Sequence, residues 1–455
     1  MTSDLAFMGL VEVGRRIASR QVSSEEVTRA QLERIAQVDP TIGSYVKVLP
    51  EQALAEAKAR DAELRQGRGR GPLHGVPVAV KDLCDLAGTA TTAGFPMFRD
   101  TMAKADSTVV ARLRAAGAVI LGKLHLTEGA LALHHPEIKP PVNPWRRDLW
   151  SGASSSGSGA ATAAGLCYGS LGSDTGGSIR FPANCNALVG LKPTWGRVSR
   201  HGVAALSDTL DHIGPMTRRV EDAAVMLGAI AGRDPADPTS SPLPVPDYLL
   251  AAAAGPRGLR IGVAAPIAQA IAEALELLRL QGAEVREITM PASEAVIAAW
   301  GAICATEAAM AHDKTYPARR EGYSEVFRGF LDAGRAVGGV DYARATVVRR
   351  AYGATLAQPF EGVDVIMAPF AAGMVPPVGA FNQLCAEPDG LTKLVSRTCL
   401  YDSTGSPVLT MPAGLSGDGI PVGFQLVGRT FEEATLCRAG LAYQDARQWQ
   451  ATPPL

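Results

Sequence analysis

Segments with helical periodicity alternate with short apolar runs along this chain, and that alternation most narrows the folds open to it. Residues 76–80 are β-branched and apolar, as in a buried strand. A helical segment at 107–116, with Ser107 as its expected cap, precedes an apolar run at 118–121. The same succession recurs at 219–231, at 267–281 with 283–288, and at 363–369. The pattern predicts an α/β fold in which α-helices cover both faces of a central mixed, twisted sheet.

A helix near the start of the sequence is predicted from a capping signal. Ser-Ser-Glu-Glu at 23–26 has the spacing of a capping box, which predicts a helix running to about Val38, with Asp39-Pro40 as its stop. The clearest linker is the proline-rich segment 234–256, after which 258–263 restarts a strand. This linker is either a boundary between subdomains or a crossing within one fold.

Two loops rich in serine and glycine lie close together in the sequence, at 151–160 (SGASSSGSGA) and 172–180 (GSDTGGSIR). Glycine lets backbone N–H groups approach a reacting atom closely because no Cβ intervenes. A serine is a weak nucleophile until a base takes its proton, and no histidine falls in or between the loops. The upstream base candidate is Lys81, in the segment GVPVAVKD at 75–82. A Ser-Ser-Lys hydrolase is therefore indicated rather than a Ser-His-Asp one.

These segments also carry a family resemblance. The chain resembles the amidase signature family, which combines a strand ending in Lys-Asp with two such serine and glycine loops. Further matching segments are GLKPT at 190–194, DHIGP at 211–215, GSPVLTMP at 405–412 and GFQLV at 423–427. The resemblance implies the amidase signature fold as one domain over 1–455. Its parts would be N-terminal helices (1–70), a catalytic core (71–232), the proline-rich crossing (233–257) and a C-terminal part (258–455) that completes the sheet and the substrate pocket.

Three residues form the catalytic triad that the resemblance implies. Ser178 is the expected nucleophile; a structural turn with a capping serine is the alternative. Ser154 would pass a proton between the lysine and the nucleophile, and in the family it follows a cis peptide bond. Ala153 stands here where the family usually has glycine. Lys81 is the expected general base, because burial beside an apolar strand would lower the pKa of its amine from about 10.4; a surface lysine at a strand end is the alternative.

Neighbouring groups are expected to support the nucleophile. An oxyanion hole is predicted from the backbone N–H groups of Thr175, Gly176, Gly177 and Ser178. Asp174 and Arg180 flank this loop, and charge-assisted hydrogen bonds would hold it down; in some relatives the equivalent arginine meets an acidic substrate group. Ser155 is a supporting residue that could be confused with Ser154.

Two segments are expected to wall the substrate pocket. The first, 126–150, separates the lysine strand from the serine loop. The second runs from Trp300 to Phe330, where Tyr323, Phe327 and Phe330 recur at helical spacing. A role in the hydrophobic core is the alternative for these aromatic residues.

Composition excludes several classes of protein. The formal net charge is −1, from 44 basic and 45 acidic residues, so no electrostatic footprint for nucleic acid is expected. Seven scattered cysteines without a CxxC pair indicate neither a disulfide framework nor a structural zinc site. The His134-His135 pair lacks the spacing of a metal motif, so neither a metal nor a cofactor is expected. No signal peptide or membrane span is recognised, which leads us to expect a cytoplasmic location and no membrane partner.

The expected function is hydrolysis of the C–N bond of a small linear amide through a serine acyl-enzyme. The resemblance also brings carbamates (urethanes), aryl amides and esters within scope. One alternative is the glutaminase (A) subunit of a tRNA-dependent amidotransferase, which shares the core and needs a partner. Another is a non-catalytic glycine-rich binding protein, although the chain has neither a P-loop nor a strand-linked GxGxxG. A homodimer is expected only by analogy with relatives.

Overall fold

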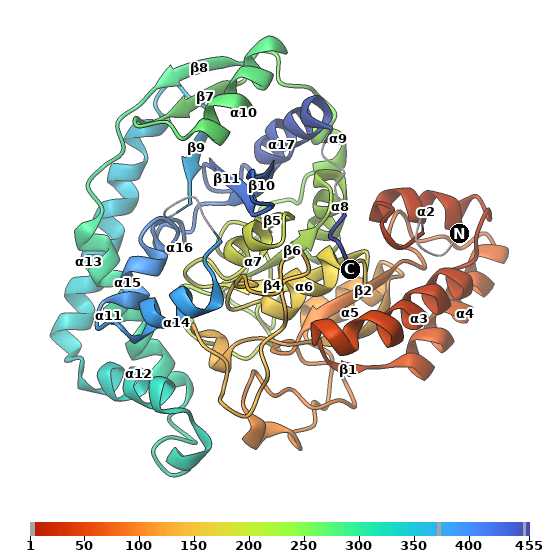
Figure 1. Ribbon diagram of the computed structural model, residues 1–455, viewed down its shortest axis with the longest axis horizontal. Helices are drawn as coiled ribbons and strands as arrows, with labels where there is room; N and C mark the ends of the chain where they lie inside the picture. Colours follow the sequence, from red (N-terminus) through yellow and green to blue (C-terminus); the bar gives the residue numbers. More distant parts are fainter. Residues whose placement is uncertain (1–4, 371–374, 449–451) are drawn as a thin grey trace.

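One continuous β-sheet lies at the centre of the computed structural model, which describes residues 5–370, 375–448 and 452–455 (Figure 1). Within these residues the sheet has 11 strands in the order β1-β3-β2-β4-β6-β5-β10-β11-β9-β7-β8. The strands are β1 (Tyr45–Val48), β2 (Pro77–Lys81), β3 (Val119–Leu124), β4 (Gly169–Asp174), β5 (Val189–Lys192), β6 (His212–Thr217), β7 (Arg260–Val263), β8 (Glu284–Glu287), β9 (Val365–Pro369), β10 (Val408–Leu415) and β11 (Pro421–Gly428). Strands from both sides of the proline-rich segment therefore join in one sheet.

The sheet is mixed, as predicted. β2 is parallel to β3 and β4, and β7 is parallel to β8 and β9. The strands β6, β5, β10 and β11 between these groups are antiparallel to each of their neighbours. Because parallel strands end at the same edge of a sheet, the carboxyl ends of β2 and β4 lie side by side.

Helices surround this sheet, with α2, α3 and α4 on one side of the molecule and α11, α12 and α13 on the other (Figure 1). The α-helices of the described residues are α2 (Leu10–Ala18), α3 (Ser24–Ile42), α4 (Pro50–Arg65), α5 (Thr108–Ala115), α6 (Ser156–Ala163), α7 (Arg180–Cys185), α8 (Val220–Ile230), α9 (Tyr248–Ala252), α10 (Gln269–Leu280), α11 (Glu294–Ala311), α12 (Glu325–Ala336), α13 (Gly339–Leu356), α14 (Val378–Ala386), α15 (Gly390–Val395), α16 (Cys399–Ser403) and α17 (Glu433–Arg447).

Both faces of the sheet are covered, and alternate residues of β2 and β3 show why. Val78 and Ile120 belong to one hydrophobic core, together with apolar residues of α5. Ala79 and Val119, one position along, belong to a second core with residues of α3, α4 and α6. Successive side chains of a strand point to opposite faces, so the two cores lie on opposite sides. Strands that are buried on both faces read as continuous apolar runs, which is how β2 and β3 were predicted.

The predicted start of α3 is confirmed, but its predicted end is wrong. Ser23 and Glu26 form both hydrogen bonds of the capping box. The helix then continues through Pro40 to Ile42. Pro40 lies in the last turn and has no N–H to donate to the preceding turn, so it removes one intrahelical hydrogen bond close to the end of the helix. The stop is instead Gly43, whose φ of 69° is the left-handed conformation that ends many helices.

A smaller correction concerns Ser107. It precedes α5, as expected for a cap, but its hydroxyl caps no N–H of that helix. The hydroxyl instead donates to the carbonyl of Asp85 at 3.1 Å. Ser107 therefore fastens the start of α5 to the loop that follows β2.

Helix α11 is the one described helix whose length and apolar composition would allow it to cross a membrane. Its Val296, Ile303 and Cys304 are buried inside the protein. The helix packs on α12 and α13 and its Trp300 reaches the loop after β4. A helix that is apolar on most sides is also what a core position requires.

Candidate active site

The ends of β2 and β4 place a lysine beside a serine-rich loop. In the parallel pairing of the two strands, Val80 lies opposite Leu171, so Lys81 at the end of β2 lies next to the end of β4. The loop 151–155 enters helix α6, which packs on β4. Residues from three separate segments of the sequence therefore meet at one edge of the sheet.

Lys81 is wholly buried and surrounded by hydroxyl groups. Its Nζ donates to the Oγ atoms of Ser154 at 2.7 Å, Ser173 at 2.8 Å and Ser155 at 3.0 Å. Burial lowers the pKa of Lys81 to about 7, and the nearby Asp174 carboxylate opposes this only in part. Lys81 is thus a lysine that can exist as a neutral amine near neutral pH.

The next residue along, Asp82, points the other way. Its Oδ1 lies 2.8 Å from Nζ of Lys123, and both side chains are wholly buried. Lys123 also donates to the carbonyl of Ala90 at 2.7 Å. This pair ties β2 to β3 and to the loop after β2. Strand alternation separates it from the group around Lys81.

Ser154 and Ser155 have different surroundings. The peptide bond between Ala153 and Ser154 is cis, with alanine in the place where the family usually has glycine. Ser155 joins the loop to β4, because its Oγ donates to the carbonyl of Ser173 and accepts from the N–H of Ser173, both at 3.2 Å. Ser173 itself was not among the predicted site residues, although it lies inside the 172–180 motif.

Ser178 lies in the turn between β4 and α7. It is 9% exposed and lines a pocket. Within the described part of the chain its hydroxyl has no hydrogen-bond partner, while its carbonyl accepts from the N–H of Ser155 at 3.2 Å. The turn therefore presents the Ser178 hydroxyl to the pocket and attaches its backbone to the serine loop.

Asp174 holds that turn together. Its carboxylate accepts from the N–H groups of Gly177 at 2.6 Å and Ile179 at 3.0 Å. Arg180 donates to the same carboxylate through Nε at 2.9 Å and Nη2 at 2.8 Å. Burial by itself raises the pKa of Asp174, but the charge of Arg180 outweighs it and keeps that pKa well below its usual range. The buried pair thus stays ionised and gives the turn one conformation.

The two glycines of the turn leave no room for a side chain. A Cβ on Gly176 would lie 2.7 Å from the Trp300 ring. A Cβ on Gly177 would lie 2.4 Å from the Phe181 ring, at a φ of 135° that residues with side chains rarely adopt. Close packing of two aromatic rings against the backbone therefore requires glycine at both positions.

The amide groups of this turn differ from one another. The N–H of Gly177 already donates to Asp174, so it is engaged in holding the turn. The N–H groups of Thr175, Gly176 and Ser178 have no acceptor within the described residues. Of the four amides that the sequence predicts for an oxyanion hole, three therefore lack a protein acceptor among the described residues.

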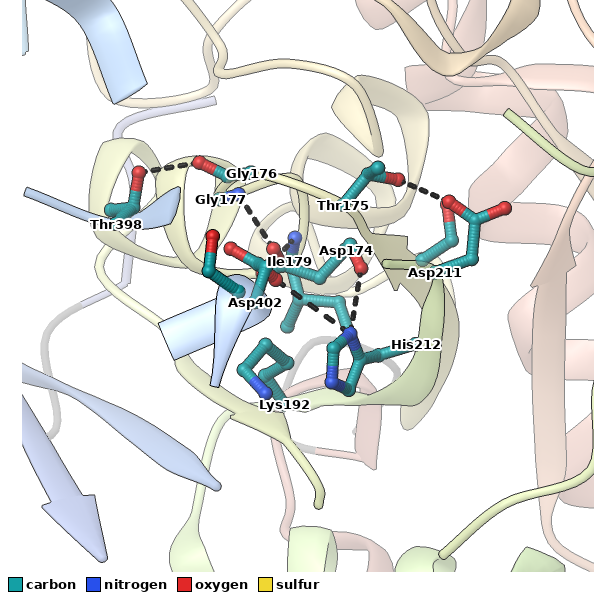
Figure 2. A network of polar contacts seen from close by, with 12 residues as sticks. Asp174, Thr175, Gly176, Gly177, Ile179, Lys192, Asp211, His212, Thr398 and Asp402 are labelled. Atoms are coloured by element: carbon teal, nitrogen blue, oxygen red, sulfur yellow. Dashed lines mark hydrogen bonds and ion pairs between the residues drawn. The ribbon is translucent and has the colours of Figure 1, made fainter. Parts of the chain in front are cut away.

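Three other segments hold the same turn, and Figure 2 shows two of them, at Asp211 and Thr398. The hydroxyl of Thr175 donates to Asp211 at 2.6 Å, and the indole N–H of Trp300 donates to the carbonyl of Thr175 at 2.8 Å. The hydroxyl of Thr398 donates to the carbonyl of Gly176. These anchors lie far from Ser178 in the sequence. Trp300 was predicted only as the start of a pocket wall, and neither Asp211 nor Thr398 was predicted as a site residue.

Behind the turn lies a cluster of buried charges (Figure 2). Arg180 donates to Asp402 at 2.5 Å as well as to Asp174. His212 lies 3.6 Å from Asp402, and burial lowers the pKa of His212 so that it stays neutral. Burial also lowers the pKa of Lys192 to about 7. Arg180 is therefore shared by two carboxylates, is wholly buried and does not line the pocket, which favours the supporting role expected for it.

The pocket over Ser178 is small, partly open to solvent and mainly apolar. Its described lining consists of Ala130, Leu131, Ala132, Ala153, Thr175, Gly176, Ser178, Phe181, Leu206, Trp300, Leu391, Leu394 and Val395. Both predicted wall segments contribute, the first through 130–132 and the second through Trp300. Tyr323 and Phe327 instead pack on Phe95, in the core role that was the alternative.

Comparison with known proteins extends these observations to the whole chain. The family described as Amidase matches residues 26–437. "Putative amidase AmiD" of Mycobacterium tuberculosis (strain ATCC 25618 / H37Rv) is 45% identical, over 98% of this chain and 95% of that protein. The glutamyl-tRNA(Gln) amidotransferase (A) subunit of Anaeromyxobacter dehalogenans (strain 2CP-C) is 40% identical, over 97% of this chain and 96% of that protein. The native peptide amidase from Stenotrophomonas maltophilia has a similar structure, with a TM-score of 0.85 at 31% identity over 98% of each chain.

The likeness therefore runs through the sheet, the helices around it and the loops that carry the serines. The sequence identity to these relatives is above the level at which only a fold is shared. This chain belongs to the amidase signature family, and it is a hydrolase that acts on amides.

Proposed function

We propose that this chain cleaves carboxylic amide C–N bonds through an acyl-enzyme on Ser178, with Ser154 and Lys81 as the proton relay. The observation that carries the proposal is the 2.7 Å contact from Lys81 Nζ to Ser154 Oγ. A buried lysine whose pKa lies near 7 can accept a proton at neutral pH, which an ordinary surface lysine cannot.

The chemistry then follows in two halves. Ser178 Oγ bonds to the substrate carbonyl carbon, while its proton passes to Ser154 and the Ser154 proton passes to Lys81. The carbonyl oxygen becomes an oxyanion beside the free N–H groups of Thr175, Gly176 and Ser178. When the C–N bond breaks, the leaving amine takes a proton back through Ser154. Water then attacks the acyl-enzyme, its proton enters the same relay, and the acid is released.

The substrate scope is proposed to be wider than amides. A carbamate or an ester presents the same planar carbonyl to Ser178 and would use the same oxyanion position. We expect a small molecule in each case. We also propose a single domain over 1–455 and a homodimer, which rest on family likeness, and a cytoplasmic location.

A glutaminase subunit remains the second candidate, because the amidotransferase relative is 40% identical over nearly the full length of both proteins. Such a subunit would need a partner to act on its own substrate. Turnover of amides by the purified chain alone would favour the free-standing amidase.

The test is intact-mass analysis after exposure to phenylmethylsulfonyl fluoride, with hydrolysis of a p-nitroanilide and a p-nitrophenyl carbamate measured alongside. We expect one sulfonyl adduct on the wild type, and neither adduct nor turnover in Ser178→Ala. Ser156→Ala is the matched control, because the Ser156 hydroxyl bonds to His134 at 3.0 Å rather than to Lys81. Unchanged turnover in Ser178→Ala would refute the mechanism.

A further inference from the structure

Apart from the nucleophile and the three backbone N–H groups proposed to bind the oxyanion, the described lining of the pocket over Ser178 offers a substrate almost no free polar group. Of its described lining residues, only Thr175 and Ser178 have hydroxyl groups, and none has an ionisable side chain. The Thr175 hydroxyl is already committed to Asp211 at 2.6 Å. The indole N–H of Trp300 is committed to the Thr175 carbonyl. A charged group placed in this pocket would therefore lose its water without gaining a partner.

The lining also indicates which half of the substrate enters. In the proposed reaction the leaving amine receives its proton from Ser154 and so departs on the side of Ser154 and Lys81. Both of these residues are wholly buried and do not line the described pocket, whose lining reaches only Ala153 on that side, whereas Thr175 and Gly176, on the oxyanion side, do line it. The substituent that fills the pocket is therefore the acyl group.

Trp300 both lines the pocket and holds the backbone of the turn that carries Ser178. It comes from helix α11, far from the catalytic motifs in sequence, and it is buried. Its ring lines the pocket and would lie 2.7 Å from any Cβ at position 176. Its N–H fixes the carbonyl of Thr175, and this peptide unit also contains the N–H of Gly176. One side chain thus lines the pocket and holds the peptide unit whose N–H is proposed to bind the oxyanion.

We propose that this site selects substrates with an uncharged, apolar acyl group, and that Trp300 is the residue that determines this preference while positioning the Gly176 amide. The proposal rests on the proposed function, since it assumes that Ser178 is the nucleophile. It also separates the chain from a glutaminase, because glutamine would place a charged α-ammonium and carboxylate on its acyl side and would need charged partners there.

The first test compares acyl groups on a constant leaving group. Acetyl, butyryl, benzoyl and succinyl p-nitroanilides are used, and succinyl serves as the charged counterpart of butyryl. We expect kcat/KM to be at least about 100-fold lower for succinyl than for butyryl, because the carboxylate is desolvated without a partner. Equal or faster turnover of the succinyl compound would overturn the inference while leaving the proposed function intact.

A second measurement does not depend on turnover. Benzamide, butyramide and succinamate are tested for their ability to slow sulfonylation of Ser178 by phenylmethylsulfonyl fluoride. The two apolar amides should protect and succinamate should not. Protection by succinamate alone would overturn the inference, whereas a protein that forms no adduct and turns over no anilide would refute the proposed function itself.

Variants of Trp300 separate its two roles. Trp300→Phe keeps an apolar ring and removes the N–H, so kcat for the butyryl compound should fall about 5- to 10-fold while KM changes less than about twofold, as expected for one lost hydrogen bond. Trp300→Ala should erase the preference for benzoyl over acetyl. Trp195→Phe, which changes a tryptophan outside the pocket, should alter neither quantity. An unchanged acyl preference in a folded Trp300→Ala would remove Trp300 from the proposal.

Discussion

Replacing Lys81 with methionine should abolish activity and yet stabilise the fold near neutral pH. The lysine is buried against hydroxyl groups rather than carboxylates, so its charge has no full compensation. Methionine has a similar length and no charge to desolvate. A general base typically contributes about 100- to 10,000-fold to the rate of a hydrolase. The kcat/KM of Lys81→Met should therefore fall at least about 100-fold.

The size of the stability change follows from the pKa of Lys81. Burial lowers that pKa from 10.5 to about 7, and a pKa difference of about 3.5 corresponds to about 5 kcal/mol opposing the folding of the protonated amine. Against this, the variant loses three hydrogen bonds to serine hydroxyls, at about 1 kcal/mol each. The net expectation is a variant about 1–2 kcal/mol more stable below pH 7.

The sign of the stability difference between Lys81→Met and the wild type must change with pH. Between pH 7 and 10.5 the unfolded wild type still binds the lysine proton while the folded wild type has released it, so wild-type stability rises with pH in that window. The advantage of Lys81→Met should therefore shrink above pH 7 and reverse near about pH 8–9, where the remaining charge cost of about 2–3 kcal/mol equals the lost hydrogen bonds.

Urea unfolding midpoints of the two proteins, measured in parallel from about pH 6 to 10, test this prediction. Lys123→Met is the matched control, because Lys123 is equally buried but lies 2.8 Å from Asp82. Removing it strands a buried carboxylate and should destabilise the fold by about 3–5 kcal/mol. A Lys81→Met variant that is less stable than the wild type at pH 6, by an amount that does not vary with pH, would refute the reasoning.

Two further predictions concern the same site. The kcat/KM of the wild type should rise with pH through about 7 as Lys81 loses its proton; a flat profile of kcat/KM from pH 5 to 8 would contradict the assignment of this base. Gly177→Ala should lower kcat at least about 100-fold, because its Cβ would meet the Phe181 ring at 2.4 Å and displace the turn. Gly353→Ala in helix α13, where no atom lies within 4 Å of the added Cβ, should instead leave kcat unchanged and stabilise the fold by up to about 1 kcal/mol in thermal unfolding.

The parts of the fold that the sequence predicted well are those with a strong local signal. β2 and β3 are β-branched and buried on both faces, and their apolar runs stand out. β4 was not predicted, because Gly169–Asp174 is built of glycine and serine, which have low strand propensity. Its pairing with β2 and β6 decides its conformation, and pairing between distant segments leaves no periodic trace in the sequence.

The site residues also differ in whether a local sequence signal marks them. Lys81, Ser154 and Ser178 lie in glycine-rich or strand-end motifs that could be found by inspection. Trp300 lies in helix α11 and Thr398 in the turn before α16, and nothing near either residue in the sequence connects it with the turn at 175–178. Only the fold shows that these two distant segments hold the carbonyls of Thr175 and Gly176.

A low lysine pKa does not by itself identify a catalytic base in this protein. Lys81 and Lys192 are both buried, and burial lowers the pKa of each to about 7. Lys192 donates to the carbonyl of Pro193 at 3.0 Å and lies among the charges behind the turn. Lys81 instead contacts three serine hydroxyls, one of them next to the Ser178 backbone. The contacts with serine hydroxyls, which carry exchangeable protons, distinguish the proposed base, whereas the lowered pKa does not. Lys192→Met should therefore stay active, with a kcat/KM that still rises with pH on the acid side, whereas Lys81→Met should lose its activity.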